Sequence, residues 1–210
     1  MNKKKYGVYL TMYSPFENLI FKEWMSKYIN NEDIILEPFA GENNIIEMME
    51  NAGFSNKWVC YDVNPPKINK TPKYTVNKLN TINNFPQSYK VVITNPPYLA
   101  RNSAKRNNIK FIKSKYDNLY KAALDKVLKK TDYVAAIIPE SFITQNLFHN
   151  RLHSVISINY KLFDDTNFPV CLALFVKKTD KDKAMLNDFF IYKNNDYIDK
   201  YSNILKIEKN

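Results

Sequence analysis

The chain of 210 residues carries 31 Lys and Arg against 21 Asp and Glu, a formal net charge of +10, and 45% of its residues are hydrophobic. This composition excludes a disordered chain and predicts one domain with a sizeable core. The charge favours a polyanionic partner, a nucleic acid or an anionic membrane face, although lysines that only solvate the surface would give the same balance.

Short apolar runs alternate with stretches of helical spacing along the chain. In chain order they predict a helix at 15–29, a strand at 31–39, a helix at 42–53, strands at 56–63, 73–79 and 88–95, a helix at 116–130, a strand at 131–139, a helix at 145–155, and strands at 155–163 and 171–178. This alternation predicts a doubly wound α/β fold, a mostly parallel seven-stranded sheet with helices on both faces. Too few residues separate the last two strands for a helical crossover, so the last strand is expected to be antiparallel. Residues 182–210 leave room for one more strand and a polar tail.

No signal peptide or membrane span is expected. The basic N-terminal stretch is followed by no apolar run of signal-peptide length, and no later segment approaches about 18 consecutive apolar residues. We therefore expect a cytoplasmic protein. Cys60 and Cys171 lie in apolar runs, where a buried thiol is the common outcome. His149 and His153 are four residues apart without an acidic or Cys partner, so helix-surface histidines are expected and no metal site.

Three strand ends are unusual, and ligands of open α/β sheets bind beyond the carboxyl ends of the strands. The first strand ends in LEPFAGENN, where Gly41 permits a tight turn close to a ligand, before a helix with free N–H groups. The second ends in YDVNPP, where the Asp62 carboxylate could accept both hydroxyls of a ribose. The fourth ends in NPPY. A single glycine turn is a weak signal, but the three together match a nucleoside cofactor laid across the sheet.

The NPPY stretch itself indicates a site for an amine. Two prolines lack N–H groups and have a fixed φ, so they hold an extended segment whose carbonyls can point into a cleft. Asn95 adds a carboxamide oxygen beside the Pro96 carbonyl, and two rigid acceptors suit the two hydrogens of an aromatic amine. Gripping both hydrogens localises the nitrogen lone pair for attack on an electrophilic methyl group. Tyr98 offers a flat face on which a base can stack.

These motifs resemble those of S-adenosylmethionine-dependent adenine-N6 DNA methyltransferases. LEPFAGENN, YDVNPP, ITNPPYLARNSAKR, AAIIPESFI and NFPVCLALFVKK follow one another in that family's order. More narrowly, the chain resembles the gamma-type enzymes of restriction and modification systems, in which the cofactor motif precedes the catalytic one. The resemblance covers residues 7–178. It implies a Rossmann-like methyltransferase fold, S-adenosylmethionine as cofactor, DNA as substrate and no metal.

The resemblance also implies the roles of individual residues. The catalytic motif would be Asn95, Pro96, Pro97 and Tyr98, and Phe168 would pack on the target base from the side opposite Tyr98. Ser14, Glu37, Phe39, Ala40 and Gly41 would lie at the methionine end of the cofactor, Asp62 at its ribose and Asn80 at its adenine. Two positions depart from the family pattern. Asn43 replaces the second glycine of the turn, which is compatible because Asn adopts left-handed backbone more readily than most residues. Asn80 replaces an Asp, which keeps an acceptor but removes a charge.

A basic stretch follows the NPPY motif. It contains Arg101, Lys105, Arg106, Lys110, Lys113 and Lys115, with two aromatic residues interleaved and no acidic one. Such a segment beside the catalytic motif could grip a DNA strand from which a base has been extruded. A solvated loop in the free protein is the alternative, and both hold if the segment orders on nucleic acid.

We expect residues 1–180 to form the methyltransferase domain and residues 181–210 a C-terminal extension that is no complete target-recognition domain. Contacts to base edges give sequence specificity, whereas contacts to phosphates do not. We therefore expect that a separate recognition chain or a missing extension selects the target site, or that specificity is loose.

Three other functions share parts of this pattern. A methyltransferase for adenine in structured RNA uses the same tetrapeptide. Methylation of a glutamine amide in a protein also employs NPPY, but the positive charge and Phe168 speak against it. The third is a non-catalytic subunit that binds cofactor or nucleic acid, and it is disfavoured because a retired active site has no need for Asn95.

Overall fold

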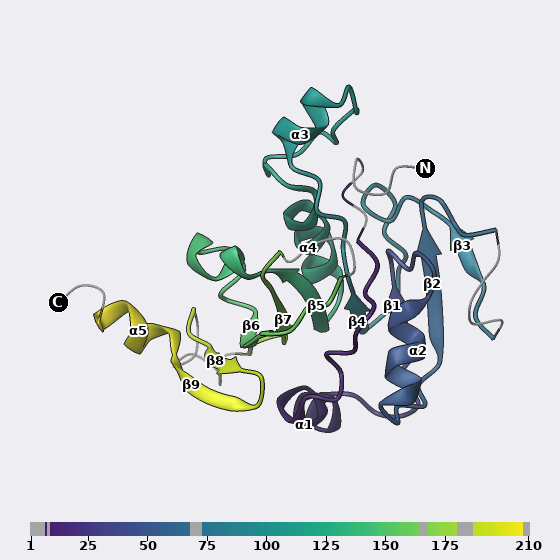
Figure 1. Cartoon of the computed structure of the whole chain (residues 1–210). Coiled ribbons are helices and arrows are strands. Elements are labelled where there is room, and N and C mark those ends of the chain that lie inside the picture. Colours follow the sequence, from purple (N-terminus) through teal and green to yellow (C-terminus); the bar gives the residue numbers. More distant parts are fainter. Residues whose placement is uncertain (1–6, 8, 68–72, 164–167, 180–186, 208–210) are drawn as a thin grey trace.

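One mixed sheet runs through the molecule, and helices cover both of its faces (Figure 1). The computed structural model describes residues 7, 9–67, 73–163, 168–179 and 187–207. Within these ranges the sheet has nine strands in the order β3, β2, β1, β4, β5, β7, β6, β8, β9. They are β1 (Ile35–Glu37), β2 (Trp58–Asp62), β3 (Val76–Lys78), β4 (Val91–Thr94), β5 (Tyr133–Pro139), β6 (Leu152–Ser157), β7 (Val170–Phe175), β8 (Phe190–Lys193) and β9 (Asp196–Lys200).

The sheet divides into a parallel half and a mixed half. The strands β3, β2, β1, β4 and β5 pair parallel with one another, so their carboxyl ends meet at one edge. β7 runs antiparallel to both β5 and β6, which confirms the predicted antiparallel pairing of the last two predicted strands. β8 continues the sheet parallel to β6, and β9 is antiparallel to β8.

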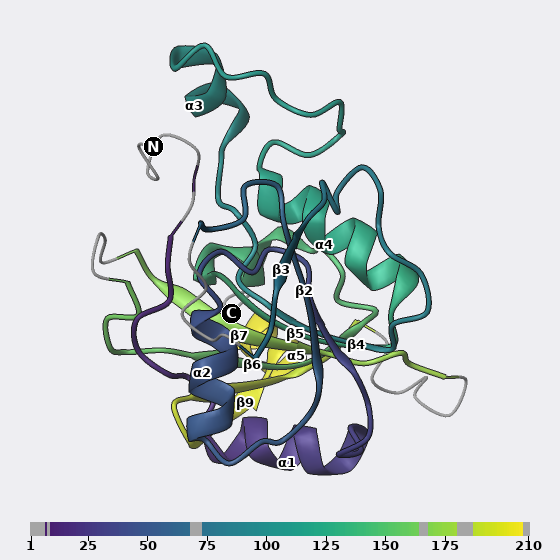
Figure 2. The same ribbon diagram turned by 90° about the vertical axis from the view of Figure 1, so that its right-hand side faces the viewer.

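Alternate residues of the central strands face two separate cores. Ile35 packs with Trp24 of α1 (Leu19–Tyr28) and Ile46 of α2 (Asn44–Asn51), whereas Leu36 packs with Leu124 of α4 (Leu119–Lys130). Figure 2 shows α1 and α2 on one side of the sheet and α4 on the other. Each fully buried side chain of this kind stabilises the fold by about 1.5–3 kcal/mol. The predicted helices on both faces are therefore confirmed at these three positions.

The sheet has two more strands than the seven expected. β8 and β9 form a hairpin joined by Asn194 and Asn195, and Asn194 has φ 52°. The helix α5 (Tyr201–Ile207) follows in place of the expected polar tail. β9 lies at the edge of the sheet, and its sequence DYIDK is mostly exposed. An edge strand needs no apolar run, which is why the pattern of apolar runs did not reveal it.

The predicted helix at 145–155 is wrong. Residues Glu140–Gln145 form the short 3₁₀ helix η2, and the chain enters β6 at Leu152. Asn146 and Phe148 have φ of 50° and 59°, which no α-helix permits. His149 and His153 are consequently not on a helix surface. His149 is only 6% exposed and lies edge-on against Phe189 and Tyr201, and His153 is part of β6.

The hairpin of β8 and β9 is tied to the start of α1. Asn18 caps this helix, because its Oδ1 accepts hydrogen bonds from the N–H groups of Ile20 and Phe21 at 2.9 and 3.2 Å. Asn18 Nδ2 donates to the Asn194 carbonyl at 2.8 Å, and Leu19 N–H donates to Asn195 Oδ1 at 2.9 Å. The hairpin turn therefore satisfies groups at a helix end 176 residues earlier in the chain.

Candidate functional site

A cavity of about 180 Å³ opens at the carboxyl ends of the parallel strands. Its walls come from the segments that follow β1, β2, β3 and β4, and from an N-terminal segment that crosses them. This is the place where open α/β sheets bind ligands. The predicted site residues that line the cavity are Phe39, Ala40, Gly41, Asp62, Asn80, Asn95, Pro96 and Pro97.

The turn after β1 is fixed to the end of β2. Gly41 adopts φ +53°, and its N–H donates to Asp62 Oδ2 at 3.0 Å. Ala40 N–H donates to the Tyr61 carbonyl at 2.9 Å. Asn43 has φ 64°, which confirms that asparagine takes the left-handed conformation expected at this position. The turn thus brings backbone of β1 and β2 close together at one wall of the cavity.

Asp62 is the last residue of β2 and presents its carboxylate to the cavity. Oδ1 accepts a hydrogen bond from Asn64 N–H at 2.7 Å, and Oδ2 accepts the one from Gly41. Burial raises the pKa of this carboxyl, and the two backbone hydrogen bonds oppose that rise. Each carboxylate oxygen has more than one lone pair, so Asp62 can accept two further hydroxyl groups.

Glu37 ends β1 and lies beneath the cavity wall, because it is 1% exposed and does not line the cavity. Its Oε1 accepts hydrogen bonds from the Thr94 hydroxyl at 2.6 Å and from Phe39 N–H at 3.0 Å. Its Oε2 is buried and has no hydrogen-bond partner among the residues described. Burial raises the pKa of Glu37 to about 8, so the carboxyl is protonated near neutral pH. Glu37 therefore braces the turn against the end of β4.

Asn95 begins the NPPY motif directly after β4, and its carboxamide is held in one orientation. Its Nδ2 donates to the Tyr9 carbonyl at 2.7 Å and to Thr11 Oγ1 at 3.1 Å. Its Oδ1 accepts a hydrogen bond from the Tyr98 hydroxyl at 2.6 Å. This oxygen was expected to be an acceptor for a ligand, and in the structure one of its two lone pairs is already engaged by Tyr98. One lone pair remains for a further donor.

The Tyr98 ring is enclosed by aromatic side chains. Tyr9 is stacked on it, with the ring centroids 5.8 Å apart and an interplanar angle of 27°. Phe163 and Tyr120 meet it in edge-to-face geometry at 6.2 and 6.0 Å. The Tyr98 hydroxyl also contacts the Ile137 carbonyl at 2.6 Å, and burial raises the pKa of this hydroxyl. The ring therefore stays a neutral hydrogen-bond donor.

Sequence reasoning missed the N-terminal segment that we call the strap, Gly7 and residues 9–12. Tyr9, Leu10 and Thr11 line the cavity, and the Tyr9 carbonyl is bonded to a residue 86 positions further along the chain. The stretch YLTM carries no turn residue or motif. Only the tertiary contacts place it, so no sequence signal could have found it.

Ser14 lies away from this cavity. It lines a second cavity together with Asn18 and Asn194, and its Oγ accepts a hydrogen bond from Phe16 N–H at 3.2 Å. The structure therefore does not bring Ser14 to the other predicted cofactor residues. Thr11 places a hydroxyl group at the first cavity instead.

Phe168 and Asn80 differ in how they relate to the cavity. Phe168 is 53% exposed and does not line it, whereas the aromatic residues Phe163 and Tyr120 are buried beside Tyr98. Asn80 lines the cavity, and its Oδ1 accepts a hydrogen bond from Asn83 N–H at 3.2 Å. The Asn80 amide thus closes a local turn at the cavity and leaves its Nδ2 as a donor.

Residues 101–116, which we call the basic arm, project from the body of the molecule and include the short helix α3 (Arg101–Arg106) (Figures 1 and 2). Arg101 closes the base of the arm. Its Nη2 donates to the carbonyls of Ser114 and Tyr116 at 2.5 and 2.6 Å, and its guanidinium lies 4.8 Å from the centre of the Phe111 ring. Ile112 of the same arm lines the cavity.

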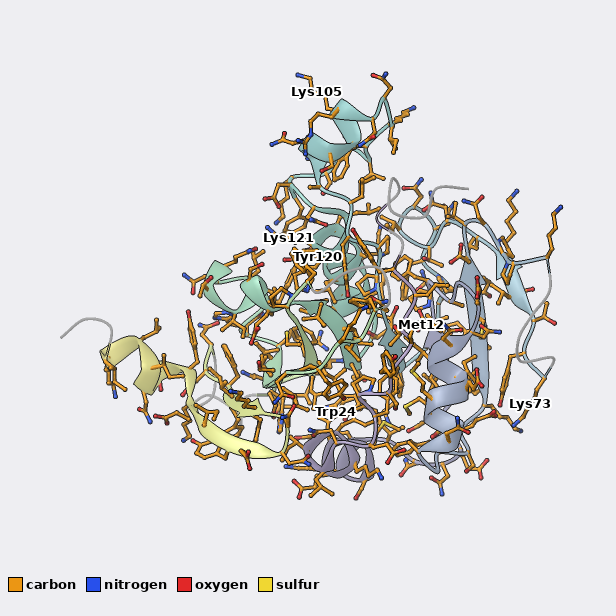
Figure 3. The ribbon with its side chains drawn as sticks, in the orientation of Figure 1. Met12, Trp24, Lys73, Lys105, Tyr120 and Lys121 are labelled. Carbon is orange, nitrogen blue, oxygen red and sulfur yellow. The ribbon has the colours of Figure 1, made fainter. Side chains whose placement is uncertain are left out.

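The other predicted cations of the arm are exposed: Lys105, Arg106, Lys110, Lys113 and Lys115. Figure 3 shows Lys105 pointing outward at the far tip of the arm. The arm therefore carries a positive surface next to the cavity, while Arg101 has a structural role in holding it.

Comparisons with known proteins identify the fold. No protein-family model and no curated protein matches the sequence. Solved structures do match. A protein from Listeria monocytogenes assigned as a class I S-adenosylmethionine-dependent methyltransferase superposes with a TM-score of 0.57 at 16% identity, over 81% of this chain and 62% of that one. The methyltransferase subunit of a type I restriction-modification system from Streptococcus thermophilus superposes with a TM-score of 0.59 at 12% identity, over 96% of this chain and 52% of that one. The M protein of the type I restriction enzyme EcoKI superposes with a TM-score of 0.60 at 12% identity, over 87% of this chain and 48% of that one.

The chain has a methyltransferase-like α/β fold with a large mixed sheet. Similarity at this level of identity establishes the fold alone. The chain spans about half to three fifths of the length of these three structures.

Two further findings concern metal ions and membranes. In the ranges that the structure covers, no group of three or more His, Cys, Asp or Glu is arranged to hold a metal ion. None of the helices seen there is both long and apolar enough to cross a membrane.

Proposed function

We propose that this chain uses S-adenosylmethionine to methylate the N6 amine of an adenine in DNA, within a modification or restriction-modification system. The observation that carries the proposal is the convergence of Asn95, Pro96 and Pro97 with Gly41 and Asp62 on one cavity. A motif suited to an aromatic amine and a wall suited to a nucleoside cofactor share the same space.

The residues of the cavity fit this cofactor. Asp62 has free lone pairs for two ribose hydroxyls, and Asn80 can meet the adenine with its amide. Apolar side chains such as Leu79 and Ile82 line the same cavity and can cover the flat faces of a base. The cofactor supplies an electrophilic methyl group when it is bound.

Asn95 and Pro96 would hold the target amine. The remaining lone pair of Asn95 Oδ1 and the Pro96 carbonyl each accept one hydrogen of the amine, which localises the nitrogen lone pair. Methyl transfer forms a nitrogen–carbon bond, breaks the methyl–sulfur bond and releases one amine proton. The Tyr98 hydroxyl does not take this proton, because burial raises its pKa and keeps it protonated. The proton therefore leaves to solvent.

The basic arm would grip the DNA beside the cavity. Its exposed Lys and Arg side chains neutralise phosphates, and Ile112 joins the arm to the cavity wall. Phosphate contacts do not read sequence. We therefore include in the proposal a separate recognition chain, in keeping with the type I systems whose methyltransferase subunits share this fold.

Methyl transfer to defined substrates tests the proposal. The chain is incubated with methyl-labelled S-adenosylmethionine and duplex DNA, and the digested DNA is analysed for labelled nucleosides. We expect labelled N6-methyladenine, and we expect Asn95→Ala to lower its yield by at least about 100-fold. Asn51→Ala, on the exposed end of α2, is the matched control and should have no effect.

Other results of this assay would support the alternative functions. Labelled adenine in structured RNA but not in DNA would make the chain an RNA methyltransferase. Binding of S-adenosylmethionine without transfer to either polymer would support a non-catalytic subunit. Undiminished transfer by Asn95→Ala would refute catalysis at this cavity.

A further inference from the structure

We propose that the strap occupies the place of the target base in the resting protein, with the Tyr9 ring as its plug, and that an incoming base must displace it. This inference rests on the proposed function, because it takes Tyr98 and Asn95 as the groups that receive the base. It assigns a role to Tyr9 that neither the NPPY motif nor the cofactor turn contains.

The first observation is that the stacking face of Tyr98 is already covered. The Tyr9 ring lies over it at 5.8 Å and 27°, which is the offset geometry that a flat base would adopt. Phe163 and Tyr120 lie nearly perpendicular to the Tyr98 ring at 6.2 and 6.0 Å, so further aromatic side chains surround it. A base that stacks on this face must therefore take the position of Tyr9.

The second observation is that the strap also binds the catalytic carboxamide. Asn95 Nδ2 donates to the Tyr9 carbonyl at 2.7 Å and to Thr11 Oγ1 at 3.1 Å. One residue, Tyr9, thus contacts both groups of the motif, with its ring on Tyr98 and its backbone on Asn95. The ring occupies the position that a stacked base would use, and the carbonyl ties the same residue to Asn95 Nδ2, on the side of the carboxamide opposite the Oδ1 acceptor.

The third observation is that Gly7 seats the strap on the backbone of the motif. Tyr98 N–H donates to the Gly7 carbonyl at 2.8 Å. Gly7 has φ +69°, and a Cβ atom at this position would lie 2.6 Å from Leu99 N and from the Tyr98 carbonyl carbon. Backbone cannot move aside as a flexible side chain can, so only glycine allows this approach.

The other end of the strap has a separate anchor. Asn44 Nδ2 at the start of α2 donates to the Thr11 carbonyl at 2.9 Å, and Met12 N–H donates to the Leu162 carbonyl at 2.9 Å. Figure 3 shows Met12 beside α2, where its Sδ lies 3.8 Å from Asn44 Nδ2. Thr11 and Met12 can therefore stay in place while Gly7 and Tyr9 lift away from the motif.

Two substitutions loosen the plug by different routes. Tyr9→Ala removes the ring that covers Tyr98, and Gly7→Ala forces the backbone away from Leu99. Tyr9→Phe keeps both the ring and the carbonyl and is expected to behave as wild type. Tyr13→Ala is the matched control, because Tyr13 follows the strap and is 53% exposed.

Binding of 2-aminopurine deoxynucleoside measures access to the stacking face. Its fluorescence is quenched when it stacks on an aromatic ring, and a free nucleoside needs neither sequence recognition nor the basic arm. In the wild type the nucleoside must break the Tyr9–Tyr98 ring contact when it enters, whereas the two variants have already lost this contact. Tyr9→Ala and Gly7→Ala should therefore bind the nucleoside about twofold to tenfold more tightly than wild type. Tyr9→Phe and Tyr13→Ala should match wild type.

Amide hydrogen exchange reports the strap directly, because the Tyr98 N–H is bonded to the Gly7 carbonyl. Saturating nucleoside should speed exchange at Tyr98 in the wild type. In Gly7→Ala exchange at this amide should be fast without nucleoside. Protection of Tyr98 that persists while the nucleoside is bound would overturn the inference.

The remaining outcomes separate this inference from the proposed function. Methyl transfer to DNA with equal KM and equal nucleoside affinity in wild type, Tyr9→Ala and Gly7→Ala overturns the plug and leaves the function intact. Tighter nucleoside binding in both strap variants without methyl transfer by any variant supports the plug and refutes the function. Failure of every variant to bind the nucleoside overturns the plug, because the surface under Tyr9 would then not accept a base.

Discussion

Replacing Glu37 by Gln should stabilise the protein at alkaline pH, and the burial of this carboxyl sets the size of the gain. In the folded protein burial raises the pKa of Glu37 from the ordinary 4.5 to about 8. Each pKa unit corresponds to about 1.4 kcal/mol, so the shift corresponds to at most about 5 kcal/mol. Between these two pKa values the folded state keeps a proton that the unfolded state has lost. The free energy of unfolding therefore falls as the pH rises from 4.5 through 8.

Gln removes this pH dependence and keeps the local contacts. Its amide oxygen can still accept hydrogen bonds from the Thr94 hydroxyl and Phe39 N–H, and it carries no charge at any pH. Urea unfolding of wild type and Glu37→Gln at pH 5 and pH 9 measures the effect. The stability of the variant relative to wild type should increase by up to about 4 kcal/mol between the two pH values, because part of the change already lies below pH 5.

The control is Glu47→Gln, which changes an exposed carboxylate on α2 and should alter stability by less than about 0.5 kcal/mol at either pH. If the stability of wild type and of Glu37→Gln changed by the same amount from pH 5 to pH 9, the reasoning would be refuted. That result would mean that Glu37 is ionised in the folded protein despite its burial.

Three further predictions address the cavity and the arm. Asp62→Asn should weaken binding of S-adenosylmethionine about tenfold or more, since hydrogen bonds to a charged acceptor are worth about 1.5–3 kcal/mol; calorimetric titration measures this, and an unchanged affinity would contradict the ribose role. Gly41→Ala should lower the free energy of unfolding by about 1–2 kcal/mol, because alanine is disfavoured at φ +53°, and urea unfolding that coincides with wild type would count against a strained turn. Combined replacement of Lys105, Lys110 and Lys113 by Ala should reduce the slope of log affinity against log salt by up to about 3, measured by fluorescence anisotropy with duplex DNA. The same slope in both proteins would exclude the arm from DNA binding.

The parallel half of the sheet could be predicted from the sequence because its strands are buried on both faces. Residues such as Val91, Val92 and Ile93 form a continuous apolar run, and all three are fully buried. The convergence of Asp62 and Asn95 on one edge then follows from the parallel order, because the carboxyl ends of such strands meet. Local sequence and global topology point to the same arrangement at these positions.

The parts that sequence reasoning missed are fixed by distant contacts. The strap lies where it does because Asn95 and Tyr98 bind it, and neither residue is near Tyr9 in the chain. The region around His149 was interpreted as a helix because its apolar residues have helical spacing, but left-handed backbone at Phe148 breaks any such helix. The edge strand β9 needs no apolar pattern, so its pairing with β8 was not apparent.

The hydrogen bonds from Asn194 and Asn195 to the start of α1 have a consequence for the order in which the chain folds during synthesis. A ribosome releases α1 early, but the Asn18 amide and the Leu19 N–H find these partners only after residues 190–200 have emerged. Until then the first helix lacks part of its capping. Nascent chains stalled before residue 190 should accordingly be cleaved faster by protease within α1 than the released protein, and equal cleavage would show that the helix matures without its late partner.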